Sequence, residues 1–445
     1  MTERSVVRQI VIETGLGKGI EEYGNMGDVS MLQAAVGKLQ QCFPGAILRV
    51  LTDSPENLAR YCPGATPLLN SGRALWFADG VMLGPLSRVV PRRVIDLLVR
   101  GKRALRARRP RLVEALLTRR LLRRNRRDEA QALFAFRRAM EQADLVLVSG
   151  SGGFFDGCQG WNLEVLDLVE AAVQQHTPVA MIGQGFGPLA DPLVRRRAAA
   201  VLPRVDLLSL RGGHGSLAAV QALGVPDAAL LVTGDEAVEM AYEARPDSAG
   251  SGLGINLRYA ASATTDEHDV AAIRPVLHAF VRRQAAPLVP LPIAMQLYTR
   301  DDEAIRMLLA GLDDASTGGA GLDTPLKVIE QAGRCRVIVT GAYHAAVFAL
   351  AQGVSVVALA RSSYFAGKFL GLQQQFGAGC QTVLLGEPQL PQRLSQALER
   401  AWDHAEIQRQ PLQATARRQI EQRRLCYERL VALVEGRVRA RAVAR

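Results

Sequence analysis

The 445-residue sequence has few cysteines and no long apolar run. Its six cysteines are scattered and form no CxxC pair, which argues against a zinc site or a disulfide framework and predicts reduced thiols. No segment approaches the roughly 20 apolar residues of a membrane span. The N-terminus also lacks the apolar core of a signal peptide. We therefore expect a soluble, cytoplasmic protein.

The remaining composition is that of an ordinary globular protein, with 48% hydrophobic and 22% charged residues. Its length corresponds to about two or three domains. The formal charge of +11 is concentrated in two segments. Residues 92–127 hold 15 Lys and Arg against two acids, and residues 409–445 hold 10 Arg against three Glu. The rest of the chain is therefore mildly acidic.

Short aliphatic and β-branched runs alternate with helical patterns along most of the chain, which predicts parallel sheets. A turn-rich segment at residues 244–254 separates two such series. We predict an α/β fold of two Rossmann-like domains, residues 1–250 and 251–386, that face each other across a cleft. Residues 387–445 are predicted to form Arg-rich C-terminal helices.

Residues 70–140 interrupt the first domain and predict an inserted, basic helical hairpin. Apolar residues recur there at helical spacing and predict one apolar face: Leu112, Val113, Leu116, Leu117 and Leu121. Three interpretations of residues 92–127 stay open. The segment is a solvated hairpin, a peripheral contact with the inner face of an anionic membrane, or a nucleic-acid contact. The scarcity of aromatic residues argues against nucleic acid.

Three glycine-rich segments follow predicted strands, at residues 24–28, 150–153 and 183–188. As turns at the carboxyl ends of parallel strands they would line one crevice with backbone N–H groups suited to phosphate or carboxylate. Tight packing at the sheet edge explains the glycines equally well. The first segment precedes a helix, whose N-terminus favours an anion. Its Asp28 is a candidate for a helix cap or a base. The spacing is not GxGxxG, so a dinucleotide site is weakly indicated.

Three basic side chains are candidates for the same cleft. Arg211 ends a predicted strand, where a guanidinium can bind a carboxylate or phosphate through two hydrogen bonds. His344 precedes an Ala-rich helix, whose dipole would lower its pKa but keep it in the neutral range for proton transfer. A capping or core histidine is the alternative. Lys368 follows the strand pattern at residues 354–360, and the alternative for it is a solvated lysine.

Taken in order, these elements resemble the polysaccharide pyruvyl transferase family. The resemblance spans roughly residues 24–380, apart from the insert. Its matches are the N-x-G-D loop at residues 25–28, a glycine-rich turn, the GQGxGP run at residues 183–188, and then Arg211, Asp235, His344 and Lys368. The family usually has an arginine where this chain has Ala342, and often an aspartate where it has Gly212. Arg258 and Arg361 are candidates to replace that arginine.

The resemblance implies a fold like that of the two-domain, GT-B-like glycosyltransferases. It also implies transfer of the enolpyruvyl group of phosphoenolpyruvate to two hydroxyls of one sugar, giving a cyclic ketal and free phosphate. The acceptor would be a surface-polysaccharide precursor, lipid-linked ones included, and no metal or cofactor is needed. His344 is the predicted general acid/base and Asp28 a second base. The predicted substrate-binding residues are Asn25, Gly27, Gly152, Gly153, Gln184, Gly185, Arg211, Asp235, Arg258, Tyr343 and Lys368.

Two other functions stay open. A glycosyltransferase-like enzyme could use a nucleotide sugar in the same cleft, with Glu330 as a ribose-binding acid. A non-catalytic family member could bind a sugar or an anion, which the missing arginine at position 342 suggests.

Overall fold

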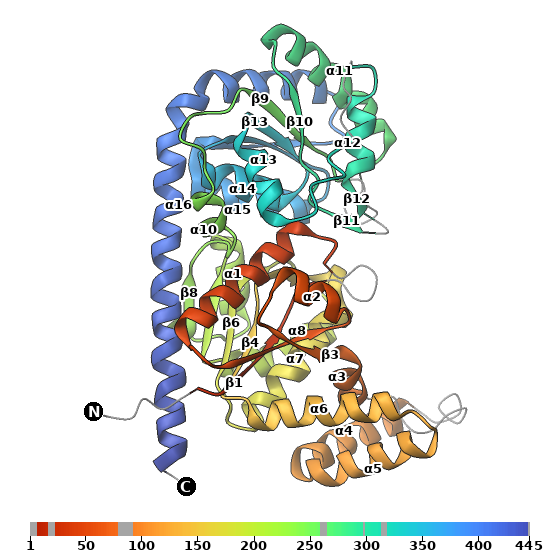
Figure 1. The fold of residues 1–445 in the computed structure, drawn as a ribbon. Helices are drawn as coiled ribbons and strands as arrows, with labels where there is room; N and C mark the ends of the chain where they lie inside the picture. The colour runs from red at the N-terminus through yellow and green to blue at the C-terminus, as the bar shows by residue number, and fades with distance from the viewer. Residues whose placement is uncertain are drawn as a thin grey trace.

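The computed structural model describes residues 7–16, 23–78, 92–258, 265–296, 299–312 and 318–443. These residues form two parallel β-sheets, one in each half of the chain, and Figure 1 shows the two halves stacked with a long helix along one side. The α/β prediction of two Rossmann-like domains is confirmed. None of the described helices is both long and apolar enough to cross a bilayer.

The first sheet has eight parallel strands in the order β3-β2-β1-β4-β6-β7-β8, with β5 paired to β6. Its strands are β1 (Gln9–Glu13), β2 (Ile47–Thr52), β3 (Thr66–Leu69), β4 (Leu145–Val148), β5 (Ser151–Phe154), β6 (Val179–Phe186), β7 (Leu207–Leu210) and β8 (Leu230–Val232). In β1, Ile10 and Ile12 enter one hydrophobic cluster and Val11 enters another. Both faces of the sheet are therefore covered, which explains why its strands read as continuous apolar runs.

The second sheet has five parallel strands in the order β10-β9-β13-β14-β15. They are β9 (Gly252–Asn256), β10 (Leu288–Pro290), β13 (Cys335–Thr340), β14 (Ser355–Ala360) and β15 (Cys380–Leu384). A small antiparallel pair, β11 (Met295–Gln296) and β12 (Thr299–Arg300), lies beside it.

The helices of the first half are α1 (Met26–Cys42), α2 (Pro55–Tyr61), α3 (Asn70–Phe77), α4 (Arg92–Arg108), α5 (Pro110–Arg123), α6 (Arg127–Gln142), α7 (Gln159–Gln174), α8 (Pro192–Val201), α9 (His214–Ala222) and α10 (Val238–Glu243). Those of the second half are α11 (Glu267–Gln284), α12 (Asp301–Leu309), α13 (Pro325–Gly333), α14 (Tyr343–Gln352), α15 (Ser363–Phe376) and α16 (Leu390–Val443).

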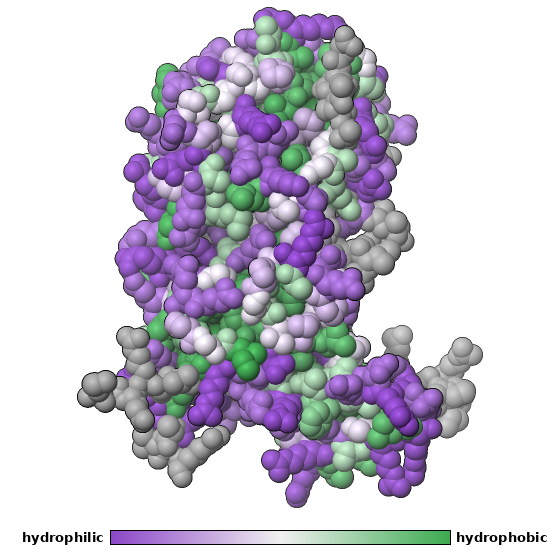
Figure 2. All heavy atoms as spheres, viewed as in Figure 1, coloured by the Kyte–Doolittle hydropathy of each residue, from purple (hydrophilic) through white to green (hydrophobic). Residues whose placement is uncertain are grey.

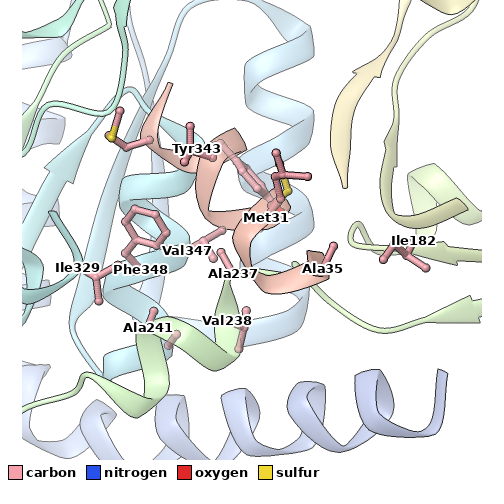
Figure 3. Close-up of a cluster of buried hydrophobic side chains, with 14 of the residues drawn as sticks. Met31, Ala35, Ile182, Ala237, Val238, Ala241, Ile329, Tyr343, Val347 and Phe348 are labelled. Carbon is pink, nitrogen blue, oxygen red and sulfur yellow. The ribbon is translucent and has the colours of Figure 1, made fainter. Parts of the chain in front are cut away.

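A single buried hydrophobic cluster joins the two domains. Figure 3 shows Met31 and Ala35 of α1 close to Val347 and Phe348 of α14, with residues of α10 beside them. Phe348 is fully buried, so truncating such a side chain would cost about 3–5 kcal/mol. The apolar packing holds the start of α1 against the start of α14, and these two helix ends form the candidate site.

The helix α16 crosses the C-terminal domain and then runs along both domains (Figure 1). It contains Pro411, which removes one helical hydrogen-bond donor and permits a bend. Arg423 of α16 pairs with Glu236 of the first domain at 2.9 Å, and both side chains are buried. The prediction of several C-terminal helices is therefore wrong: the segment is one helix, anchored in both domains.

Two further predictions need correction. Residues 70–142 contain four helices, α3 to α6, with residues 79–91 outside the described part of the chain, so the insert is more than a hairpin. On α5 the predicted apolar face is divided. Its members Val113 and Leu121 are buried and Leu117 packs against the core, whereas Leu112 and Leu116 are 51% and 56% exposed.

Candidate active site

The first turn of α1 lies against the second domain. Asn25 caps this helix, because its side-chain oxygen accepts hydrogen bonds from the backbone N–H groups of Gly27 at 3.0 Å and Asp28 at 3.4 Å. The backbone N–H of Met26 donates to the carbonyl of Ile293 in the second domain at 2.8 Å. Asn25 thus serves as a cap in this structure, and the cap fixes Asp28 at the interface between the domains.

His344 lies in the first turn of α14, directly across from Gly27, and is only 5% exposed. A Cβ atom added to Gly27 would lie 1.9 Å from the imidazole Nδ1 and 2.1 Å from Cγ. Only glycine therefore allows this contact. The glycine of the N-x-G-D loop makes room for a histidine of the other domain.

Arg211 and Asp235 form a buried pair beside His344. Arg211 follows β7, and its Nη1 lies 3.1 Å from Asp235 Oδ2 and 3.5 Å from His344 Nε2. The distance from His344 Nε2 to Asp235 Oδ2 is 3.7 Å. The other Asp235 oxygen accepts from the backbone N–H of Ala237 at 3.0 Å. The guanidinium also lies over the Tyr343 ring, 4.5 Å from its centre.

Two glycines make room for cations from both domains. A Cβ atom on Gly152 would lie 2.2 Å from Arg211 Nη2 and 3.0 Å from Lys368 Nζ, and one on Gly185 would lie 2.9 Å from Arg211 Nε. The prediction that both glycines lie in turns is wrong. Gly152 is in β5 and Gly185 is in β6. The missing side chains at both positions leave room for the Arg211 guanidinium.

Arg258 follows β9 and is held near the site by Asp301. Its Nε lies 3.7 Å from Asp301 Oδ1, while the other Asp301 oxygen accepts from Asn256 Nδ2 at 2.8 Å. Arg258 acts electrostatically on Asp28, His344 and Lys368. Arg361 instead pairs with Asp269, with Nε and Oδ2 at 3.1 Å. Of these two candidates, Arg258 is thus the arginine that acts on the site.

The site shifts the pKa of three ionisable groups. Burial raises the pKa of Asp28 to about 6, against the opposing effects of Arg211 and Arg258. Burial, with the same two arginines, lowers the pKa of Lys368 to about 7. Burial followed by Arg211 lowers the pKa of His344 well below 6.5. The prediction of a near-neutral pKa for His344 is therefore wrong: in this structure the imidazole is uncharged at neutral pH.

Two predicted binding residues support the walls of the site in this structure. Gly153 packs against the ring of Trp161, with 2.7 Å between an added Cβ and the nearest ring carbon. The Gln184 side chain points into the sheet, and its Nε2 donates to the carbonyls of Val148, Ser149 and Ile182. Neither group is directed toward the cationic cluster, by which we mean Arg211, Arg258 and Lys368.

Tyr364 is a site residue that the sequence reasoning missed. Its hydroxyl donates to the Gly152 carbonyl at 2.6 Å, and its ring stacks on Phe155 with 3.9 Å between centres. Lys368 Nζ lies 4.2 Å from the centre of the same ring. The four-residue spacing of Tyr364 and Lys368, which places them on one face of a helix, was the available signal.

A cavity of about 550 Å³ opens beside the cationic cluster. Its walls come from the end of β6, the loops after β6 and β7, the helix α9, Tyr343 at the start of α14, and α15. Arg211 and Lys368 are the charged residues among its described lining, which includes no acid. The cavity therefore combines one cationic end with a largely uncharged remainder.

Several solved structures have a similar overall arrangement at low sequence identity. The UDP-GlcNAc 2-epimerase from Methanocaldococcus jannaschii is 10% identical, with a TM-score of 0.49 over 89% of this chain and 92% of that one. The UDP-GlcNAc 2-epimerase from Neisseria meningitidis is 11% identical, with a TM-score of 0.48 over 93% and 99%. A UDP-glucose: anthocyanidin 3-O-glucosyltransferase is 9% identical, with a TM-score of 0.49 over 97% and 100%.

No curated protein matches the sequence. The family model described as polysaccharide pyruvyl transferase matches residues 25–363, which is most of the chain. The match begins at the cap of α1 and includes Arg211 and His344. The chain belongs to the polysaccharide pyruvyl transferase family.

Proposed function

We propose that this protein transfers the pyruvyl group of phosphoenolpyruvate to a sugar of a surface-polysaccharide precursor, as a cyclic ketal. The observation that carries the proposal is the position of two cations beside His344: Arg211 Nη1 lies 3.5 Å from His344 Nε2, and Arg211 and Lys368 both lie against Gly152. Phosphoenolpyruvate is a small anion with a phosphate and a carboxylate. Charge-assisted hydrogen bonds from fixed cations suit both groups and any charge that develops on them.

His344 is the proposed acid toward the methylene carbon of the donor. It is uncharged in this structure, because burial and Arg211 lower its pKa and disfavour the imidazolium. A bound anion offsets these cations and raises the pKa of His344. The proton adds to the methylene carbon, which becomes a methyl group, and the adjacent carbon becomes electrophilic. One sugar hydroxyl attacks that carbon and a second displaces phosphate.

Asp28 is the proposed base toward the acceptor. With a pKa of about 6 it is largely ionised at neutral pH, and it can accept a proton from an attacking hydroxyl. The two hydroxyls release two protons in total. One replaces the proton that His344 gives to the methyl group, and the other leaves with phosphate. The reaction is thus balanced without a metal or a redox partner.

The cavity beside Arg211 and Lys368 is the proposed place for the acceptor saccharide. Gln374 of its lining is exposed, and its side-chain amide can hydrogen-bond the hydroxyls of a sugar. An uncharged wall next to a cationic end suits a neutral sugar beside an anionic donor. The acceptor is a free or lipid-linked saccharide on the cytoplasmic side of the membrane.

Thermal denaturation with phosphoenolpyruvate, paired with a phosphate-release assay on candidate acceptors, tests the function. We expect phosphoenolpyruvate to raise the Tm of the wild type. Arg211→Met and Lys368→Met should abolish that shift, and Lys327→Met, at an exposed lysine of the second domain, should keep it. His344→Ala should keep the shift and lose phosphate release.

The alternatives give different results in the same assays. Stabilisation by UDP or GDP, and none by phosphoenolpyruvate, would indicate a nucleotide-sugar glycosyltransferase. A non-catalytic member would be stabilised by phosphoenolpyruvate or a sugar without releasing phosphate. Full phosphate release by His344→Ala would refute the assignment of the acid.

A further inference from the structure

Exposed apolar side chains are concentrated on the insert of the first domain. Sixteen large apolar side chains of the described residues are exposed, and seven of them lie on α4 to α6. They are Val94, Leu98, Leu105, Leu112, Leu116, Leu122 and Phe134. Single exposed apolar residues need no explanation, but a group on adjacent helices marks an interaction surface.

Five of these residues form stripes, one on α4 and one on α5. Val94, Leu98 and Leu105 of α4 lie within about 40° of one another on a helix with 3.6 residues per turn. Leu112 and Leu116 lie one turn apart on α5. The core-facing side of α5 is a different one, which carries the buried Val113 and Leu121. The helix therefore has two apolar sides, and one of them is unpartnered.

The outer side of the same helices is strongly basic. Six arginines are exposed there, and no carboxylate of the described residues lies within ion-pair distance of any of them. They are Arg108, Arg109, Arg119, Arg120, Arg123 and Arg124. Glu114 is the only acid in residues 97–127. It faces Arg137 on the inner side, with 3.7 Å between Oε2 and Nε. Glu141 lines a hollow together with Glu114, Arg119 and Arg123, and it too pairs with Arg137. Arginines therefore outnumber acids on the surface that carries the apolar stripes.

The insert lies at the end of the N-terminal domain, away from the C-terminal domain (Figure 1). Figure 2 shows hydrophobic and strongly hydrophilic residues side by side at this end of the molecule. A flat partner that contacts α4 and α5 would therefore leave the cleft between the domains unobstructed.

We propose that the outer side of α4 and α5 docks on an anionic lipid bilayer. Leucines of the stripes enter the headgroup region, and the flanking arginines contact lipid phosphates while their stems cover apolar surface. Nucleic acid fits the surface less well, because residues 92–127 contain no aromatic side chain to stack on bases. The exposed leucine side chains would also bury little apolar surface against the phosphodiester backbone of a nucleic acid. This proposal does not depend on the chemistry of the cleft.

Co-sedimentation of the full-length protein with vesicles tests the proposal. We expect binding to vesicles of phosphatidylglycerol and phosphatidylcholine, and little binding to phosphatidylcholine alone. Leu112→Glu/Leu116→Glu and Arg119→Glu/Arg123→Glu should each lower the partition coefficient by about tenfold or more. Each variant should keep the far-UV circular dichroism spectrum and Tm of the wild type, because the altered side chains are exposed.

Matched controls separate this surface from general charge and hydrophobicity. Ile407→Glu/Leu425→Glu changes two exposed apolar residues of α16, and Arg195→Glu/Arg196→Glu changes two exposed arginines of α8. Both should bind vesicles as the wild type does. Equal losses in the controls would overturn the proposal. So would absent vesicle binding together with tight, insert-dependent binding of a fluorescent RNA or DNA oligonucleotide.

Discussion

Replacement of Lys368 by arginine tests whether a titrating ammonium group controls anion binding in the cleft. Burial and the neighbouring arginines lower the pKa of Lys368 to about 7. A bound phosphoenolpyruvate anion would raise that pKa, so binding takes up a proton at a pH above about 7. The affinity for phosphoenolpyruvate should therefore fall as the pH rises above about 7, because less of the free protein then carries a charged Lys368.

The expected loss approaches about tenfold in affinity per pH unit above about 7, since one pKa unit corresponds to about 1.4 kcal/mol. In Lys368→Arg the guanidinium stays charged and this loss should disappear. Isothermal titration calorimetry in buffers of different ionisation enthalpy measures both quantities. At about pH 8 the wild type should take up most of one proton more than Lys368→Arg on binding, because any uptake by Asp28 and His344 is common to both proteins.

The titration of the ligand phosphate is common to both proteins and cancels in the comparison. Lys368→Met serves as a second variant, which should bind weakly at every pH and show no alkaline loss. If Lys368→Arg showed the same loss and the same proton uptake as the wild type, another group would be responsible and the reasoning would fail.

Three further substitutions test contacts between and within the domains. Gly27→Ala places a Cβ 1.9 Å from His344 Nδ1, where ordinary contacts are 3.4–4 Å. The imidazole must then shift by more than about 1 Å, which should lower kcat/KM about 100-fold in a phosphate-release assay. Arg423→Met leaves Glu236 buried without its partner and should cost about 3–5 kcal/mol in urea unfolding; adding Glu236→Gln should recover part of it. Tyr364→Phe removes the hydrogen bond to the Gly152 carbonyl, and hydrogen–deuterium exchange should rise in β5. Unchanged activity, stability or exchange, respectively, would contradict each account.

The strands of both sheets were largely predictable, because burial on two faces forces apolar residues into nearly every position. Two strands have weak sequence patterns for physical reasons. The edge strand β3 carries Pro67 and a mostly exposed face. The strand β5 reads Ser-Gly-Gly-Phe, a composition typical of turns. The exact domain limits at residues 250 and 386 stay predictions.

The candidate site was predictable where a side chain follows a strand, as Arg211 does, because parallel strands direct their carboxyl ends to one edge. The contacts that depend on the packing of two domains were not predictable. No local pattern shows that Gly27 faces His344, or that Asp301 holds Arg258. The pKa of His344 depends on the same packing, since its perturbing cations come from both domains.

The long helix α16 limits how the cleft can open. It is fixed to the first domain by Arg423, and it packs against the second domain around Leu412. A rotation of the domains about an axis near this helix would give its largest displacement on the opposite side of the molecule (Figure 1). Gly27 and His344 lie on different domains. Such a rotation would break their contact and the shared hydrophobic cluster, and it would separate the proposed acid, His344, from the proposed base, Asp28.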